Sequence, residues 1–396
     1  MFAGQVGRVG RVGIASPFKG GGFSLAAFMA SQSDGFWYDF GQTDRLFQEN
    51  VGPTPANDPA EVIGLALSSR LWAGRTLTEE LAGQAEFVTN GDFSNGTTGW
   101  TTNSTTQSVV AGALRVAATA ANGFSNQTLL GLNTSRMYRL SCTVSNVSGG
   151  VVVVLVRTNV GAAIVNTAIV SGAGPQAVEI FFQPTTSDVQ VRLQVGTSGQ
   201  SADFDNVSVK EVSRYPATQA TGSFKPTFQT TGAKFDGTDD NLLTGYLAQA
   251  AAGGNFLVAR VTVPVTLAGT QIIAGTNDSG GANPFRLGIT TAGALRATVG
   301  AGSTLDSTGI DLRGTETVVG LSYDGATVRT FAGSAQVGSF AETGAISTTV
   351  PFRLGARNDN GTAATFFAGS IDSILAGRQA LDNARFNQIA AALMAA

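Results

Sequence analysis

Residues 137–157 read MYRLSCTVSNVSGGVVVVLVR, and this stretch decides the fold class. Two runs rich in Val, Leu and Thr, 137–145 and 151–157, are separated by a Ser-Gly-Gly turn, which predicts two short β-strands. The same alternation continues on both sides, in residues 107–110, 113–117, 177–183, 189–195 and 204–212. Short strands at this spacing predict an antiparallel β-sandwich or jelly roll over residues 86–213.

The last part of the chain, residues 224–396, repeats this rhythm with longer loops and ends in a predicted helix. Asp382 stands where it can cap the free amide groups of a helix N-terminus. Phe386, Ile389, Ala390 and Leu393 follow at helical spacing and predict an apolar face. Residues 214–223, which contain Tyr215-Pro216, are the predicted linker between the two β-rich parts.

The composition excludes several kinds of site. The 396 residues include no histidine and one cysteine, which excludes a Ser/His/Asp triad, a His-ligated metal and an intrachain disulfide. The formal net charge is −3 and the basic residues are scattered, so we expect no nucleic-acid partner. No apolar run approaches the ~18–20 residues of a membrane span. Carboxylate chemistry stays open: oxygen-ligated calcium, a two-carboxylate glycosidase, or no catalysis.

Two segments precede the first predicted sandwich. Residues 1–22 contain VGRVGRVG and have no core-forming pattern, so they predict an arm that is disordered or becomes ordered only against a neighbouring subunit. Residues 23–85 combine short helical patches, proline breaks and a dense aromatic patch. Such a patch in a broken segment predicts docking onto a partner protein, with a small self-contained core as the alternative. The docking residues are Phe36, Trp37, Tyr38, Phe47 and Trp72.

Two motifs frame the first sandwich. Residues 90–100 read NGDFSNGTTGW and residues 202–209 read ADFDNVSV. They resemble the opening and closing strands of jelly-roll carbohydrate-binding modules. The resemblance implies a structural calcium at Asn90, Asp92 and Asp205, although the family usually has an acid where this chain has Ser94; no other cofactor is expected. Asx turns at Asp92 and Asn95 are the alternative, because calcium needs about six to eight oxygen ligands, several of them charged.

Three motifs mark the last part of the chain. Residues 233–241 read AKFDGTDDN, residues 321–329 read LSYDGATVR, and residues 366–374 read FFAGSIDSI. In this order they resemble concanavalin A-like and laminin-G-like lectin domains. The resemblance implies a second sandwich over residues 224–396. The predicted fold class is mainly β, with jelly-roll and concanavalin A-like antiparallel sandwiches after a short irregular and helical N-terminal anchor.

A further resemblance concerns the setting of the protein. Residues 34–39 (DGFWYD), 46–49 (LFQE) and 64–67 (GLAL) resemble a short module of tailed-bacteriophage virion proteins. The resemblance implies a tail fibre, head spike or decoration protein on the virion surface. Residues 1–85 would attach it to other virion proteins of the capsid or tail. A homo-oligomer is expected, with a trimer favoured, because such appendages are commonly symmetric.

The predicted function is to display lectin-like domains that bind host surface polysaccharide. Sugar sites commonly place an aromatic ring beside amide and carboxylate groups, and Trp100 fits a core position better than such a site. The candidates are Tyr246, Tyr323, Asn277, Asp278, Asn358 and Asp359. One alternative is an architectural spacer that binds no glycan. The other is a glycosidase using acids among Asp236, Asp239, Asp240 and Asp372, but Asp-Gly-Thr-Asp-Asp fits a tight turn equally well, so we predict no enzyme activity.

Overall fold

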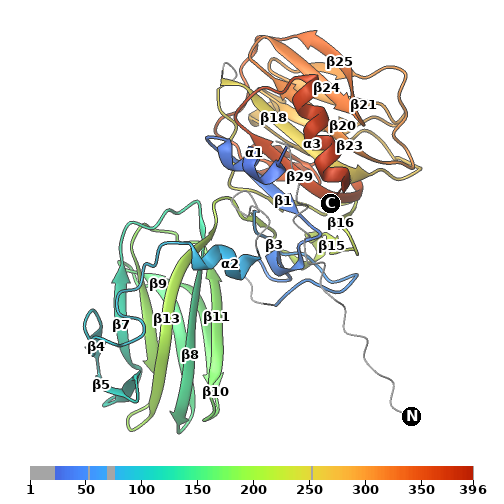
Figure 1. Cartoon of the computed structure of the whole chain (residues 1–396). Coiled ribbons are helices and arrows are strands. Elements are labelled where there is room, and N and C mark those ends of the chain that lie inside the picture. The colour runs from blue at the N-terminus through green and yellow to red at the C-terminus, as the bar shows by residue number, and fades with distance from the viewer. Residues whose placement is uncertain (1–22, 52–53, 69–75, 251–252, 396) are drawn as a thin grey trace, which may run out of the picture.

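Two β-sandwich lobes lie side by side in the computed structural model (Figure 1). The structure describes residues 23–51, 54–68, 76–250 and 253–395. Antiparallel strands in paired sheets make up most of both lobes, which confirms the predicted mainly β fold class. No helix in these ranges is long and apolar enough to cross a membrane.

The first lobe is a jelly roll with its own core. Its sheets have the strand orders β10-β9-β12-β7-β4 and β11-β8-β13-β6-β5. Alternate residues point inward along strands such as β12, where Val189, Val191, Leu193 and Val195 are buried. The bounds are β4 Thr101–Asn103, β5 Thr105–Val110, β6 Ala113–Ala118, β7 Gly123–Leu129, β8 Met137–Ser148, β9 Val151–Thr158, β10 Ile164–Ser171, β11 Gln176–Phe182, β12 Val189–Val195 and β13 Ser201–Ser213.

One sheet of the second lobe has the order β15-β16-β29-β18-β23-β24-β25, and β1 also pairs with β29. Its central strands are apolar on both faces because they are covered on both sides, by the other sheet and by helices. The bounds are β1 Gly35–Asp39, β15 Thr227–Phe228, β16 Ala233–Asp236, β18 Asn255–Thr262, β23 Glu316–Tyr323, β24 Thr327–Ala332, β25 Ala335–Ala341 and β29 Ala368–Gly377.

The facing sheet of the second lobe has the order β2-β3-β14-β17-β26-β19-β20-β21-β22. The short strands β27 and β28 join it, since β27 pairs in parallel with β19. The bounds are β2 Leu46–Phe47, β3 Leu65–Ala66, β14 Ala217–Thr218, β17 Leu242–Leu243, β19 Gln271–Asn277, β20 Phe285–Ile289, β21 Leu295–Val299, β22 Ser303–Asp306, β26 Arg353–Leu354, β27 Arg357–Asp359 and β28 Thr362–Ala364.

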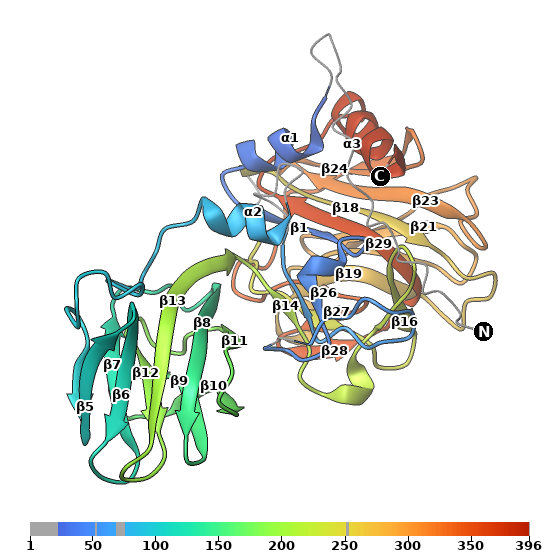
Figure 2. The same cartoon turned by 60° about the horizontal axis from the view of Figure 1, so that its bottom comes forward.

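Helices α1 (Leu25–Ser31) and α3 (Asn383–Ala395) cover the outer face of the sheet that contains β18, β23 and β29 (Figure 2). The predicted start of α3 is confirmed, because the Asp382 carboxylate accepts a hydrogen bond from the Arg385 amide at 2.7 Å. All four residues of its predicted apolar face are buried. The ring of Phe386 stacks on Phe331 at 4.6 Å, and the sheet has Gly320 beneath it, where a Cβ would lie 2.6 Å from that ring.

The aromatic patch is buried inside the chain, so the prediction that it docks onto a partner is wrong. Strand β1 pairs with β29 from Gly35 opposite Gly377 to Asp39 opposite Ser373. Phe36 and Tyr38 therefore face the core of the second lobe, Trp37 packs beneath the helices, and Phe47 contacts Phe181 of the jelly roll. Trp72 lies outside the described residues.

Two predicted segment boundaries also need correction. Residues 23–85 are not a separate anchor, because β1, β2 and β3 belong to the two sheets of the second lobe. The predicted linker contributes β14, which pairs with both β3 and β17. The jelly roll is thus inserted into the second lobe, and its two ends are adjacent, since the Phe87 amide donates to the Val209 carbonyl at 3.0 Å.

Candidate functional site

The two tyrosines predicted to bind sugar are core residues. Tyr246 is 1% exposed and Tyr323 is fully buried, so neither ring offers a face to a ligand, and these two predictions are wrong. The hydroxyl of Tyr323 donates to the Gly344 carbonyl at 2.7 Å. In the jelly roll, Trp100 is 4% and Tyr138 is 1% exposed, so these rings are buried as well.

The four polar candidates, Asn277, Asp278, Asn358 and Asp359, lie where strand β19 pairs with strand β27. The two tyrosines do not belong to this group. Asn277 lies opposite Asp359 in the register, and its amide donates to that carboxylate at 2.8 Å. Asn358 is fully buried and donates to the Pro351 carbonyl at 2.7 Å. Asp278 accepts a 2.5 Å bond from Ser347, which with other hydrogen bonds holds the pKa of its carboxyl below the usual range. These side chains close loops, and we assign them no role in sugar binding.

The predicted calcium residues lie on two neighbouring segments of the jelly roll, with Asp205 on β13. The loop of Asn90 and Asp92 lies next to β13, where the Val207 amide donates to the Gly91 carbonyl at 2.9 Å. The Asp92 carboxylate accepts bonds from the amide and hydroxyl of Ser94, at 3.2 and 3.0 Å, which lower its pKa. This geometry is an Asx turn at Asp92, which was the predicted alternative to a calcium site. Calcium binding by Asn90, Asp92 and Asp205 stays a prediction.

A different group gathers carboxylates. Asp236, at the end of β16, and Asp239 and Asp240, in the turn that follows, place oxygens within 4.8 Å of one another. Asp236 accepts backbone N–H bonds from Thr238, Asp239 and Asp240, so the stretch forms the tight turn that was the alternative to a catalytic pair. Burial, and then the charge of Asp236, raises the pKa of Asp240 to about 7. These oxygens could ligate one calcium ion.

This raised pKa predicts a pH-dependent stability. The pKa of Asp240 is about 7 in the folded chain and about 3.9 in an unfolded one, so folding favours the protonated form. The stabilisation is present below pH 4 and is lost as the pH rises towards 7. We expect Asp240→Asn to raise the melting temperature more at pH 7.5 than at pH 4.5, measured by thermal unfolding. Asp58→Asn, at an exposed carboxylate, is the control, and an equal gain from Asp240→Asn at both pH values would contradict this prediction.

A polar pocket of about 270 Å³ lies where the two lobes meet. Its walls come from the turn before β1, the loop before β8, the β13–β14 connection, the loop after β17 and the end of β29. We call it the junction pocket. It is lined by Ser33, Asp34, Asn133, Ser135, Arg136, Arg214, Tyr215, Gly245, Leu247 and Arg378.

The lobes are held together beside this pocket by an apolar cluster and a buried ion pair. The short helix α2 (Leu77–Ala82) lies between the lobes (Figure 1). An Arg45 guanidinium nitrogen lies 2.7 Å from a Glu80 carboxylate oxygen, with the two side chains 1% and 9% exposed. The apolar cluster joins both lobes and α2, and consists of Phe47, Leu65, Leu67, Leu77, Leu81, Met137, Phe181 and Val212. Burial of this kind favours one fixed geometry for the pocket.

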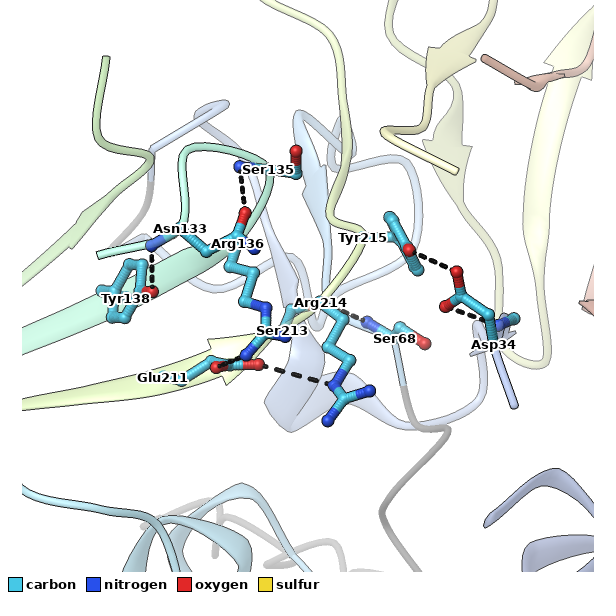
Figure 3. Close-up of polar contacts among 11 residues, drawn as sticks. Asp34, Ser68, Asn133, Ser135, Arg136, Tyr138, Glu211, Ser213, Arg214 and Tyr215 are labelled. Atoms are coloured by element: carbon cyan, nitrogen blue, oxygen red, sulfur yellow. Dashed lines mark hydrogen bonds and ion pairs between the residues drawn. The ribbon is translucent and has the colours of Figure 1, made fainter. Parts of the chain in front are cut away.

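Arginines of both lobes line the junction pocket, and acids hold them. Figure 3 shows two of these arginines, Arg136 and Arg214, with Glu211. The Glu211 carboxylate pairs with Arg136 at 2.5 Å and lies 3.9 Å from Arg214. Across the pocket, the Asp34 carboxylate pairs with Arg378 at 3.0 Å. All three arginine side chains are 30–37% exposed, so they are open to a ligand from solvent.

Tyr215 supplies the aromatic ring of the pocket. Its hydroxyl donates to Asp34 at 2.7 Å, and its ring packs edge-on against the buried ring of Tyr246 at 5.4 Å. Burial and the Asp34 carboxylate raise the pKa of Tyr215 to about 12, so the hydroxyl stays protonated at physiological pH. Beside the ring, Gly245 leaves space, because a Cβ there would only reach ordinary contact with Tyr215 and Ser135.

The residues of the junction pocket were not among the predicted site residues. Arg214 and Tyr215 lie in the predicted linker, and Arg136 and Arg378 stand at strand ends without a motif. The signal that could have been used is the pair Arg214-Tyr215 at the exit of the jelly roll. The pair lies at a pocket only because the jelly roll is inserted into the second lobe, which brings both ends of the jelly roll to one place.

Comparisons with known proteins found likeness in structure alone. No protein-family model matches the chain, and no curated protein matches it. A sialidase carbohydrate-binding module (CBM40) of Ruminococcus gnavus is 20% identical over 35% of this chain and 84% of its own, with a TM-score of 0.30. A CBM4 structure is 15% identical over 31% and 99%, with a TM-score of 0.28. A family 16 carbohydrate-binding module is 15% identical over 31% and 98%, with a TM-score of 0.26.

Proposed function

We propose that this protein binds glycans without catalysing a reaction, and that the sugar binds in the junction pocket. The observation that carries the proposal is the pocket itself, an open polar cavity built by both lobes around the ring of Tyr215. Its volume lies just below the ~300–1,000 Å³ of typical small-molecule pockets, which fits about one sugar ring. Hydroxyl, amide and guanidinium groups around it can hydrogen-bond the hydroxyl groups of that ring.

The absence of a catalytic pair from the pocket supports the non-catalytic part of the proposal. A glycosidase needs two carboxyl groups ~5–9.5 Å apart across the sugar. Among the described residues that line the pocket, Asp34 is the one carboxylate, and Tyr215 and Arg378 already engage it. Asp372, on β29, does not line the pocket, and its carboxylate lies 3.4 Å from Arg260.

The proposed setting is the surface of a phage-like virion, where a homo-oligomer, with a trimer favoured, would present the pocket to host polysaccharide. This part of the proposal rests on the resemblance of residues 34–39, 46–49 and 64–67 to a module of tailed-bacteriophage virion proteins. Because residues 36–47 are committed to the second lobe, attachment to other virion proteins is proposed for residues 1–22, which lie outside the described residues. An otherwise intact chain that lacks residues 1–22 should be missing from purified particles.

The binding test uses one substitution that fills the pocket. Gly245 lacks a positive φ, and a Cβ there makes only ordinary contacts with Tyr215 and Ser135, so Gly245→Leu should place its side chain in the pocket without unfolding the lobe. We expect the full chain to bind on a glycan array of bacterial surface polysaccharides, and Gly245→Leu to lose that binding. The matched control is Gly269→Leu, at a glycine with nothing within 4 Å of its Cβ position. A full chain that binds no glycan would instead support the architectural spacer.

A further inference from the structure

The charges of the junction pocket do not balance. Three guanidinium groups line it, from Arg136, Arg214 and Arg378, together with the carboxylate of Asp34. Within the part of the chain that the structure describes, the one further carboxylate paired with these arginines is that of Glu211, which does not line the pocket itself. Counted over the described residues, one positive charge is therefore left over in a half-enclosed cavity, where interactions between charges are stronger than in bulk water.

That excess lies at Arg214. Its one ion pair among the described residues is the 3.9 Å contact between its Nε and Glu211, which is longer than a hydrogen bond. Glu211 is already held by Arg136 at 2.5 Å, so its charge is shared between two arginines. The Arg214 Nε is buried without a hydrogen-bond partner, while the side chain as a whole is 37% exposed. This guanidinium thus has donors and charge available for a ligand (Figure 3).

We infer that the junction pocket takes an acidic sugar, whose carboxylate pairs with Arg214 while its ring lies beside Tyr215. The inference rests on the proposed function and narrows it to one class of glycan. A carboxylate matches the planar fork of a guanidinium with two parallel hydrogen bonds, and its single charge equals the excess. Asp34 does not oppose such a ligand, because Arg378 and Tyr215 hold that carboxylate on the other side of the pocket.

The test compares carboxylated polysaccharides with their neutral counterparts on the full chain. The probes are polygalacturonate, alginate and polysialic acid, each before and after chemical reduction of its carboxyl groups, with dextran sulfate as the sulfated arm. We expect at least one carboxylated polymer to bind, and its reduced form to bind at least about tenfold more weakly, because a charge-assisted bond is lost. Arg214→Ala should lose a similar factor, and Arg214→Lys should recover only part of it.

The control variant is Arg313→Ala, since Arg313 is exposed and pairs with its neighbour Asp311 at 2.6 Å, at a place outside the pocket lining. Equal binding of reduced and carboxylated forms, tighter binding of dextran sulfate, or unchanged binding by Arg214→Ala would overturn the inference. Neutral glycans that bind the full chain but not Gly245→Leu would refute the acidic sugar and leave the proposed function standing. No binding to any polysaccharide would refute both.

Discussion

Phe36→Ala is expected to destabilise the second lobe by about 3–5 kcal/mol, the usual cost of truncating a buried phenylalanine. Phe36 is fully buried, and its ring lies 4.9 Å from Tyr38 and 5.3 Å from Tyr246. The substitution removes contacts between β1 and both sheets, so the cavity cannot close by moving one loop. Denaturant unfolding should show the transition of the second lobe at lower denaturant, with that of the jelly roll unchanged.

The matched control for this prediction is Phe224→Ala. Phe224 is 38% exposed and should change the unfolding free energy by much less. Residues 23–85 could form a separate anchor or an integral part of the second lobe, and these two interpretations predict different effects of Phe36→Ala. A separate anchor would let Phe36→Ala leave the second lobe intact, and a stability equal to that of the unchanged chain would contradict the burial described above.

Glu80→Ala is expected to destabilise the chain by about 3–5 kcal/mol, because it removes one member of a buried ion pair. The remaining guanidinium of Arg45 is 1% exposed and would lose the carboxylate that lies 2.7 Å away. The loss falls on the junction, since Glu80 belongs to α2 between the lobes. Thermal unfolding should show a lower midpoint for the second lobe, and small-angle scattering should show a larger radius of gyration.

Two controls separate the buried charge from other effects. Glu80→Gln keeps the shape and one hydrogen-bond acceptor, so it should cost less than the alanine variant. Glu179→Ala removes a partner of Arg139 from an ion pair whose side chains are 30–35% exposed, and should cost at most about 1 kcal/mol. Equal losses from Glu80→Ala and Glu179→Ala would show that the junction pair is not a buried one.

Local pattern predicted much of the fold. The alternation of apolar and polar residues predicts strands such as β12, and the cap at Asp382 with its apolar stripe predicts α3, because both signals depend on neighbours within a few residues. The pairing of β1 with β29 joins residues more than 300 positions apart. No local signal carries such a pairing, so the aromatic patch around Phe36 indicated burial without indicating that the partner is the chain itself.

The site was predicted less well than the fold, for the same reason. The residue types of Tyr246 and Tyr323 predict sugar-binding rings, but the structure buries both rings in the core of the second lobe. The junction pocket depends on Arg136, Arg214 and Arg378, which are spread over more than 240 positions and meet because the jelly roll is an insertion. The composition left carboxylate chemistry open, and among the described residues three carboxylates come together at Asp236, Asp239 and Asp240.

The central claim is that a sugar binds between the lobes, and a crystal structure of the full chain with a bound oligosaccharide tests it most directly. The oligosaccharide would be the tightest binder from the polysaccharide comparison. The account predicts one sugar ring beside Tyr215, with its carboxylate within hydrogen-bond distance of Arg214. A sugar bound on the outer surface of the jelly roll, with the junction pocket free of it, would contradict the account.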